Sequence, residues 1–167
     1  MDVSDIIVAW ARWGVKHRNQ WNYTQGAQRM SDINHAGILP VFADCSAAVT
    51  LWYNWAGAPD PNGQKYNHTG YTGTLLAHGK KIDRTEVKPG DVIVYGPGTG
   101  EHAALIVEVH ANGDILTVSH GQQTDPSYVW CGIPKGPVTG FPSDTRVPTF
   151  LRFNTNALGQ ANIHRPS

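Results

Sequence analysis

The chain of 167 residues carries 13 basic and 13 acidic side chains, so with neutral histidines it has no net charge at pH 7. This length fits one domain, and without a basic surplus we do not expect it to bind nucleic acid or an anionic membrane through charge. Its longest apolar stretch is far shorter than the ~20 residues that span a bilayer, so membrane insertion is not expected either.

The first third of the chain predicts two helices. Apolar residues at helical spacing, with Asp2 as a candidate cap, predict a helix over residues 3–16. A polar loop is expected next, and it holds Trp21, Tyr23 and Arg29. A second helix is expected from Asp44 to about Trp55, since Gly57 can take the left-handed conformation that ends a helix.

The rest of the chain predicts strands. A short helix is expected around residues 72–78, closed by Gly79. The strand candidates are residues 91–95, 101–110, 114–120, 128–133 and 149–153. Helices come first and an antiparallel sheet second, so the predicted fold class is α+β, with N-terminal helices packed on the sheet. We expect residues 1–153 to form one domain and residues 154–167 to be a polar tail or linker.

The chain has two cysteines, Cys45 and Cys131, too few for a disulfide framework. A bridge between them would disable Cys45 as a nucleophile, and Cys131 lies in a strand-like run where we expect it to be inert. The N-terminus shows no basic-then-apolar order typical of a signal peptide. Synthesis in a reducing cytoplasm is therefore expected.

Cys45 is the candidate nucleophile. If Asp44 caps the second helix, Cys45 is the first helical residue, where free N–H groups and the helix dipole favour a thiolate. The dipole contributes only about 0.3–1 kcal/mol, so a neighbouring imidazolium must supply most of a lowered pKa. The alternative is a small buried core residue, as most free cysteines are.

His102 is the candidate general base. It follows the glycine-rich residues 96–100 and opens a predicted strand, which could place it at the rim of a cleft. Together, Cys45 and His102 indicate a cysteine hydrolase. The alternative for His102 is an ordinary solvated surface histidine.

The register of the predicted hairpin decides what lies beside His102. With a two-residue turn at residues 112–113, His102 shares its face with Ser119. With a three-residue loop at residues 111–113, it shares its face with His120. We favour the second register because it gathers more apolar side chains beneath the helix, and it predicts a hydrogen bond between the two imidazoles. The rivals for this orienting role are Gln123, Ser119 and Asp125.

A metal site is the weaker interpretation of the same histidines. His102, His110 and His120 could in principle hold zinc, but the chain lacks a compact ligand spacing. His102 and His110 also sit at opposite ends of one strand, roughly 26 Å apart at the rise of an extended chain. We therefore expect no metal and no cofactor.

Three motifs occur in the order found in a known family. DCS at residues 44–46, KPGDVIVY at 88–95 and HAALI at 102–106 together resemble the NlpC-type cell-wall cysteine peptidases. WNYTQG at residues 21–26 is similar to the upstream segment whose tyrosine lies beside the nucleophile. GYTGTL at residues 70–75 and SHG at 119–121 resemble the N-terminal peptidase domains of actinobacterial phage endolysins.

The resemblance implies a papain-like fold and cleavage of an amide bond in the stem or crossbridge peptides of peptidoglycan. It implies that Cys45 is the nucleophile, His102 the base and His120 the orienting residue. The oxyanion-binding and substrate-binding positions that it implies are Tyr23, Asp44, Ser46 and Gln123. The chain departs from the family pattern at Ala47, which replaces the usual glycine after Cys-Ser.

Two other functions remain open. One is an N-acetylmuramoyl-L-alanine amidase that uses the same Cys-His pair, and the other is a non-catalytic module that binds the cell wall. In each case the expected partner is peptidoglycan and the expected state is a monomer. By the resemblance, the protein would be made in the bacterial host cytoplasm and would act on the wall after release.

Overall fold

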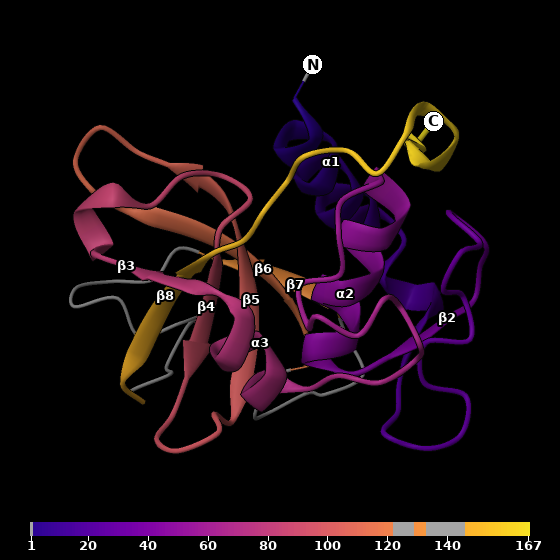
Figure 1. Cartoon of the computed structure of the whole chain (residues 1–167), viewed down its shortest axis with the longest axis horizontal. Helices are drawn as coiled ribbons and strands as arrows, with labels where there is room; N and C mark the ends of the chain where they lie inside the picture. Colours follow the sequence, from indigo (N-terminus) through magenta and orange to yellow (C-terminus); the bar gives the residue numbers. More distant parts are fainter. Residues whose placement is uncertain (1, 122–128, 133–145) are drawn as a thin grey trace.

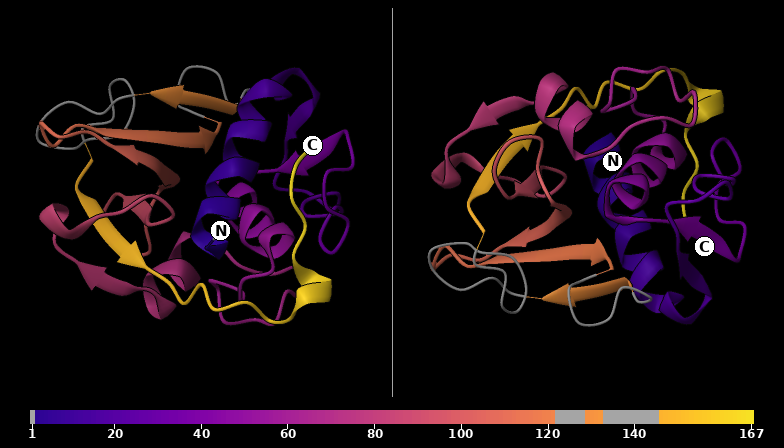
Figure 2. Two further views of the ribbon diagram at one scale, coloured as in Figure 1. Left: turned by 90° about the horizontal axis from the view of Figure 1, so that it is seen from above. Right: turned by 90° about the horizontal axis from the view of Figure 1, so that it is seen from below.

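Two layers make up the structure, a computed structural model that describes residues 2–121, 129–132 and 146–167. Two helices, α1 (Val3–Lys16) and α2 (Cys45–Ala56), pack together and against one face of a six-stranded sheet, as Figures 1 and 2 show. The third helix is α3 (Thr72–His78). The strands are β1 (Trp21–Tyr23), β2 (Val41–Ala43), β3 (Lys80–Ile82), β4 (Val92–Tyr95), β5 (His102–Val109), β6 (Ile115–His120), β7 (Val129–Gly132) and β8 (Pro148–Arg152). The predicted α+β class is confirmed.

Both long helices begin directly after their predicted capping residues, and α2 ends at the predicted Gly57. Asp2 accepts a hydrogen bond from the backbone N–H of Ser4 at the start of α1. Asp44 accepts one from the N–H of Ala47 at the start of α2, and Gly57 ends that helix with a φ of 86°. All residues of α2 except Asn54 are buried, so this helix forms the centre of the core. Rings on α1, α2 and β1 extend that core through edge-on contacts among Trp10, Trp13, Trp21 and Trp55 and a tilted contact between Trp21 and Trp52.

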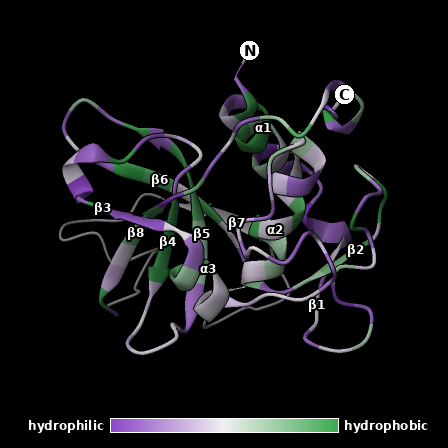
Figure 3. Ribbon diagram, viewed as in Figure 1, coloured by the Kyte–Doolittle hydropathy of each residue, from purple (hydrophilic) through white to green (hydrophobic). Residues whose placement is uncertain are grey.

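The large sheet is antiparallel throughout, with strand order β3-β8-β4-β5-β6-β7. We call the side that packs on α1 and α2 the helix face; Val94, Ala103 and Leu105 belong to its core. Tyr95 and Ala104 belong to a second apolar cluster on the other side, which we call the far face. Hydrophobic residues concentrate on β4, β5 and β6, whereas the edge strand β3 is largely hydrophilic (Figure 3).

The β5–β6 hairpin has the expected loop but an additional bulge. The N–H of His110 bonds to the carbonyl of Asp114 over 2.8 Å, which confirms the three-residue loop. A register shift between Ile106 and Glu108 then inserts one extra residue into β5. Beyond this bulge, Leu105 pairs with Val118.

That bulge reverses the predicted face of one histidine. His120 follows Val118 by two residues and lies on the helix face, whereas His102 pairs with Tyr95 and lies on the far face. The expectation that His102 and His120 share a face is therefore wrong, because a single inserted residue exchanges the two faces of a strand.

The segment expected to be a polar loop contains β1, which pairs in parallel with β2. Both strands have three residues, too few to show a sequence periodicity. Trp21 is buried in the core and Tyr23 is 37% exposed at the end of the strand. This small sheet lies beside the start of α2 and so contributes a residue to the candidate site.

Residues 154–167 run back across the two long helices (Figure 1). The N–H of Leu158 bonds to the carbonyl of Gly57, and the N–H of His164 bonds to that of Trp55. The indole N–H of Trp10 donates to the carbonyl of His164 over 2.8 Å. Within the part of the chain that the structure describes, no helix combines the length and apolar character needed to cross a membrane.

Candidate active site

Cys45 occupies the first position of α2, directly after the Asp44 cap. The backbone N–H of Ala103 in β5 lies beside its sulfur and acts to lower the pKa of the thiol. The residue is 9% exposed, and its thiol lies between the start of the helix and the sheet. This contact places the sulfur one residue along the backbone from His102.

The environment of Cys45 favours the neutral thiol. Burial, followed by the negative charge of Asp44, raises the pKa of Cys45 to about 11. The backbone N–H groups of Ala103 and Ser46 and the charge of Arg29 lower it, but by less. The expected low pKa is therefore wrong for this structure. The helix start is worth less than one pKa unit, whereas full burial can shift a pKa by several units.

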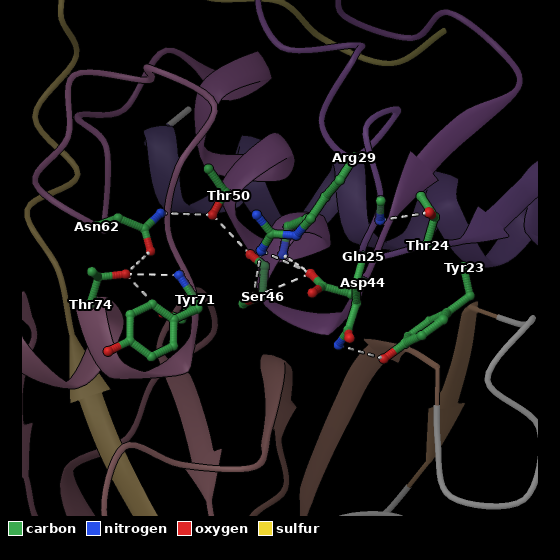
Figure 4. Close-up of polar contacts among 12 residues, drawn as sticks. Tyr23, Thr24, Gln25, Arg29, Asp44, Ser46, Thr50, Asn62, Tyr71 and Thr74 are labelled. Atoms are coloured by element: carbon green, nitrogen blue, oxygen red, sulfur yellow. Dashed lines mark hydrogen bonds and ion pairs between the residues drawn. The ribbon is translucent and has the colours of Figure 1, made fainter.

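An ion pair between Arg29 and Asp44 lies at the start of α2 (Figure 4). The Nη2 atom of Arg29 lies 3.0 Å from Oδ1 of Asp44 and donates to Oγ of Ser46 over 2.9 Å. The same Oδ1 atom accepts from the N–H of Ala47 over 2.9 Å. Asp44 and Ser46, expected at substrate-binding positions, are both buried and bonded within the protein. The sequence predicts only a loop position for Arg29, since no local pattern links it to residues 44–46.

Tyr23 lies beside this ion pair at the end of β1. Gln25 Nε2 donates to its hydroxyl over 3.4 Å (Figure 4). Burial, followed by the charges of Cys45 and Asp44, raises the pKa of Tyr23 above its usual value of 10.0. The phenol therefore stays protonated near neutral pH and can donate a hydrogen bond to an oxyanion.

The two histidines approach this region from different sides. His120 is fully buried, with its ring centre 5.6 Å from that of Tyr23 and 5.4 Å from that of Trp21. The ring of His102 is stacked on Tyr95 at 6.1 Å on the far face. The structure thus brings Cys45, Tyr23 and His120 together on the helix face, and it places the backbone but not the ring of His102 with them.

Of the other residues considered for the site, two lie within β6 and β7 and two lie outside the described part of the chain. Gln123 and its rival Asp125 lie outside the described residues. Ser119 precedes His120 on β6 and therefore lies on the far face with His102. The backbone of Cys131 lies in β7, as the strand-like pattern predicts.

A chain of hydrogen bonds connects the start of α2 with α3 (Figure 4). Thr50 Oγ1 donates to the carbonyl of Ser46, and Asn62 Nδ2 donates to Thr50 Oγ1, both over 2.8 Å. Thr74 Oγ1 donates to Asn62 Oδ1 over 2.8 Å and accepts from the N–H of Tyr71 over 2.9 Å. No local sequence pattern reveals these bonds, because the partners are distant along the chain.

The histidines considered as zinc ligands do not converge. Among residues 2–121, 129–132 and 146–167, no group of three His, Cys, Asp or Glu side chains could hold a metal ion. His110 lies at the opposite end of β5 from His102, with Nε2 3.7 Å from the carboxylate of Glu108.

No family model and no curated protein matches the sequence, whereas the fold matches that of solved structures. The P60 domain of an antigen from M. avium subspecies paratuberculosis has a TM-score of 0.53 and 15% identity, covering 90% of this chain and 93% of that chain. A hypothetical invasion protein of Mycobacterium tuberculosis has a TM-score of 0.53 and 17% identity, covering 92% of this chain and 63% of that one.

RipD of Mycobacterium tuberculosis, a non-catalytic NlpC/p60 domain protein adapted to peptidoglycan binding, has a TM-score of 0.52 and 19% identity. That alignment covers 91% of this chain and 98% of RipD. The chain therefore has the papain-like α+β fold of NlpC/P60 domains. A likeness at these identities concerns the fold and leaves the chemistry to the residues.

Proposed function

We propose that the protein is a peptidoglycan hydrolase that cleaves an amide bond in stem or crossbridge peptides through a cysteine thiolate. The observation that carries this proposal is the contact of the Cys45 thiol with the N–H of Ala103 at the start of β5. A capped cysteine on a core helix and the strand opened by a histidine meet there, on a fold shared with NlpC/P60 domains. The order of the sequence motifs supports the same function.

The proposed reaction is acyl transfer. Cys45 gives its proton to an imidazole, and the thiolate attacks the carbonyl carbon of the substrate amide. The N–H groups at the start of α2 and the Tyr23 hydroxyl stabilise the oxyanion. The carbon–nitrogen bond then breaks as the imidazolium protonates the leaving amine. Water hydrolyses the thioester, which yields the carboxylic acid and restores the thiol.

We assign the base to His102 and the orienting role to His120, as the motif order implies. In the structure the His102 ring is stacked on Tyr95, so the assignment requires that ring to turn toward the helix face. His102 is the first residue of β5 and is only half-buried, so it is less constrained than a residue inside the strand. The buried thiol would then ionise when substrate and imidazole are both in place.

A specific observation favours a second function, that of a non-catalytic module that binds peptidoglycan. The resting thiol is buried with a pKa of about 11, and the His102 ring lies on the opposite face of the sheet. RipD shows that this fold can exist without catalysis. In a binding module the buried neutral thiol and the position of the His102 ring would persist when peptidoglycan binds.

Digestion of purified cell walls distinguishes the candidates. We expect the chain to release soluble fragments with new amino groups inside the peptides, identified by mass spectrometry, and Cys45→Ala to release none. Separation of intact peptides from the sugar would identify an amidase instead. Sedimentation with the walls, without any release, would support the binding module and contradict the hydrolase.

The proposal also includes an endolysin-type role for the protein. Residues 70–75 and 119–121 resemble segments of actinobacterial phage endolysins, so we propose a bacteriolytic role after release from the host cytoplasm. The test is lysis from without, measured as the loss of turbidity when the chain is added to actinobacterial cells with permeabilised envelopes. Clearance of isolated walls without any effect on such cells would argue against this role.

A further inference from the structure

Arg29 makes an unusual contact for a residue in a surface turn, because its guanidinium reaches into the first turn of α2. A single nitrogen, Nη2, lies within hydrogen-bond distance of both Asp44 Oδ1 and Ser46 Oγ. The side chains of the pair are only 14% exposed for Arg29 and 10% for Asp44. Such a pair is shielded from solvent and is worth more than a pair on the surface.

The backbone holds Arg29 in place. The N–H of Arg29 bonds to the carbonyl of Gly26, which closes the turn. The next residue, Met30, is fully buried and donates its N–H to the carbonyl of Phe42 in β2. β2 ends at Ala43, directly before Asp44. The same short segment therefore fixes both partners of the ion pair.

The Asp44 cap has two opposing effects at this site. As a cap it stabilises α2 by about 1 kcal/mol, because it satisfies a free N–H group at the helix start. As a carboxylate next to Cys45, it disfavours the thiolate by repulsion of like charges. A neighbouring cation would leave the first effect intact and reduce the second.

We propose that Arg29 is a positioning residue of the active site, which fixes the Asp44 cap and offsets its charge so that Cys45 can ionise. The inference rests on the proposed hydrolase function. It deepens that function by assigning a role to a residue that the motifs do not contain. Arg29 acts through Asp44 and contacts no reacting atom in this scheme.

The electrostatic environment of Cys45 agrees with this role. Among the described residues, Asp44 and Arg29 act on the charge of the thiol, and Tyr23 from β1 and His120 from β6 lie on the same face of the sheet. The imidazole of His102 at the start of β5 lies on the far face. Asp44 raises the pKa of both Cys45 and Tyr23, and Arg29 lowers both. The cation and the carboxylate thus act on the same two groups with opposite signs.

The test is the pH dependence of Cys45 alkylation by iodoacetamide, followed in the intact chain by peptide mass spectrometry so that Cys131 is scored separately. In Arg29→Gln we expect the apparent pKa of Cys45 to rise by about one unit, seen as a roughly tenfold slower reaction at a fixed pH below that pKa. Arg29→Lys, which keeps the charge, should restore most of the rate. The matched control is Arg18→Gln, since Arg18 is an exposed arginine whose side chain donates to the carbonyl of Val15.

A double-mutant cycle with Asp44→Asn tests the mechanism. We expect Asp44→Asn alone to speed alkylation, and Arg29→Gln to have a much smaller effect in that background because the charge it offsets has gone. An unchanged alkylation pKa in Arg29→Gln, with only a lower melting temperature, would overturn the inference. So would an equal shift with and without Asp44.

Alkylation requires no substrate, so the two proposals can fail separately. If the chain does not cleave cell walls but Arg29→Gln still slows alkylation, the hydrolase function fails and the effect of Arg29 on the thiol remains. If walls are cleaved and the cycle shows no coupling, the function stands and the role of Arg29 fails.

Discussion

At the residue scale, Cys45 combines a helix start that favours its thiolate with a burial that opposes it. The sulfur contributes little to the core compared with the tryptophans around α2, so its removal should cost little stability. We expect Cys45→Ala to abolish wall hydrolysis and to leave the near-ultraviolet circular dichroism and the melting temperature close to those of the parent chain. Residual clearance of walls by this variant would contradict the proposed mechanism.

The two histidines make different predictions because their surroundings differ. His102→Gln changes a half-buried side chain at the end of a strand, so we expect turnover to fall by about 10²–10⁴ with little change in stability. His120→Gln disturbs a fully buried ring packed on Trp21 and Tyr23, so both turnover and melting temperature should fall. Turnover and thermal unfolding measured on both variants check this. Full activity of His102→Gln with an inactive, folded His120→Gln would transfer the role of base to His120.

Tyr23 provides a test of the oxyanion site. The pKa of Tyr23 is raised above 10.0, so the hydroxyl remains a hydrogen-bond donor in the neutral and mildly alkaline range. Ionisation of Tyr23 should therefore cause no loss of activity below pH 10. We expect Tyr23→Phe to lower kcat by about 10² with little change in KM, as for the loss of one oxyanion donor. The variant should melt as the parent chain does, since the ring remains. A Gln25→Ala control removes only the contact to the hydroxyl, and an equal loss there would argue against a direct role for Tyr23.

At the scale of elements, the helices were predictable and the small sheet was not. Asp2, Asp44 and Gly57 act through local bonds to their own helix ends, so the sequence carries the information. β1 and β2 form only because residues 20 positions apart are brought together by the packing of the surrounding elements. Such three-residue strands have no pattern that a sequence window could detect.

The β5–β6 hairpin shows where sequence reasoning about the site ends. Residues 111–113 predict the loop correctly, since Gly113 takes a φ of 90° there. The bulge lies in HAALIVEV, a run of apolar residues with no glycine or other mark at Val107. Both faces of this part of β5 are buried, so the pattern of apolar residues does not fix its register. The motif residues could therefore be identified, but the faces of His102 and His120 could not.

At the scale of the whole molecule, the candidate site lies where β1, the start of α2 and the β5–β6 hairpin meet, three parts of the chain that are distant in the sequence. The sequence motifs identify Cys45 and the histidines because each motif has its own local signal. Arg29 has none, since its role depends on the path that places its turn against α2. The candidate nucleophile could therefore be found from sequence, whereas Arg29 could not.

Residues 154–167 provide the test at this largest scale. Their three hydrogen bonds to α1, α2 and Gly57, and the packing of Ile163 on the core, tie both long helices together from outside the sheet. Removal of the segment would leave the indole N–H of Trp10 without this acceptor, at a cost of about 1–3 kcal/mol for a buried donor. We expect a chain of residues 1–153 to melt several degrees below the full chain and to keep its activity at low temperature, because no described residue of the candidate site lies in this segment. The measurement is thermal unfolding of the two chains. Wall hydrolysis at about 20 °C, near the temperature at which such domains are most stable, is the control for folding. Equal melting temperatures would show that the segment is a linker outside the folded unit.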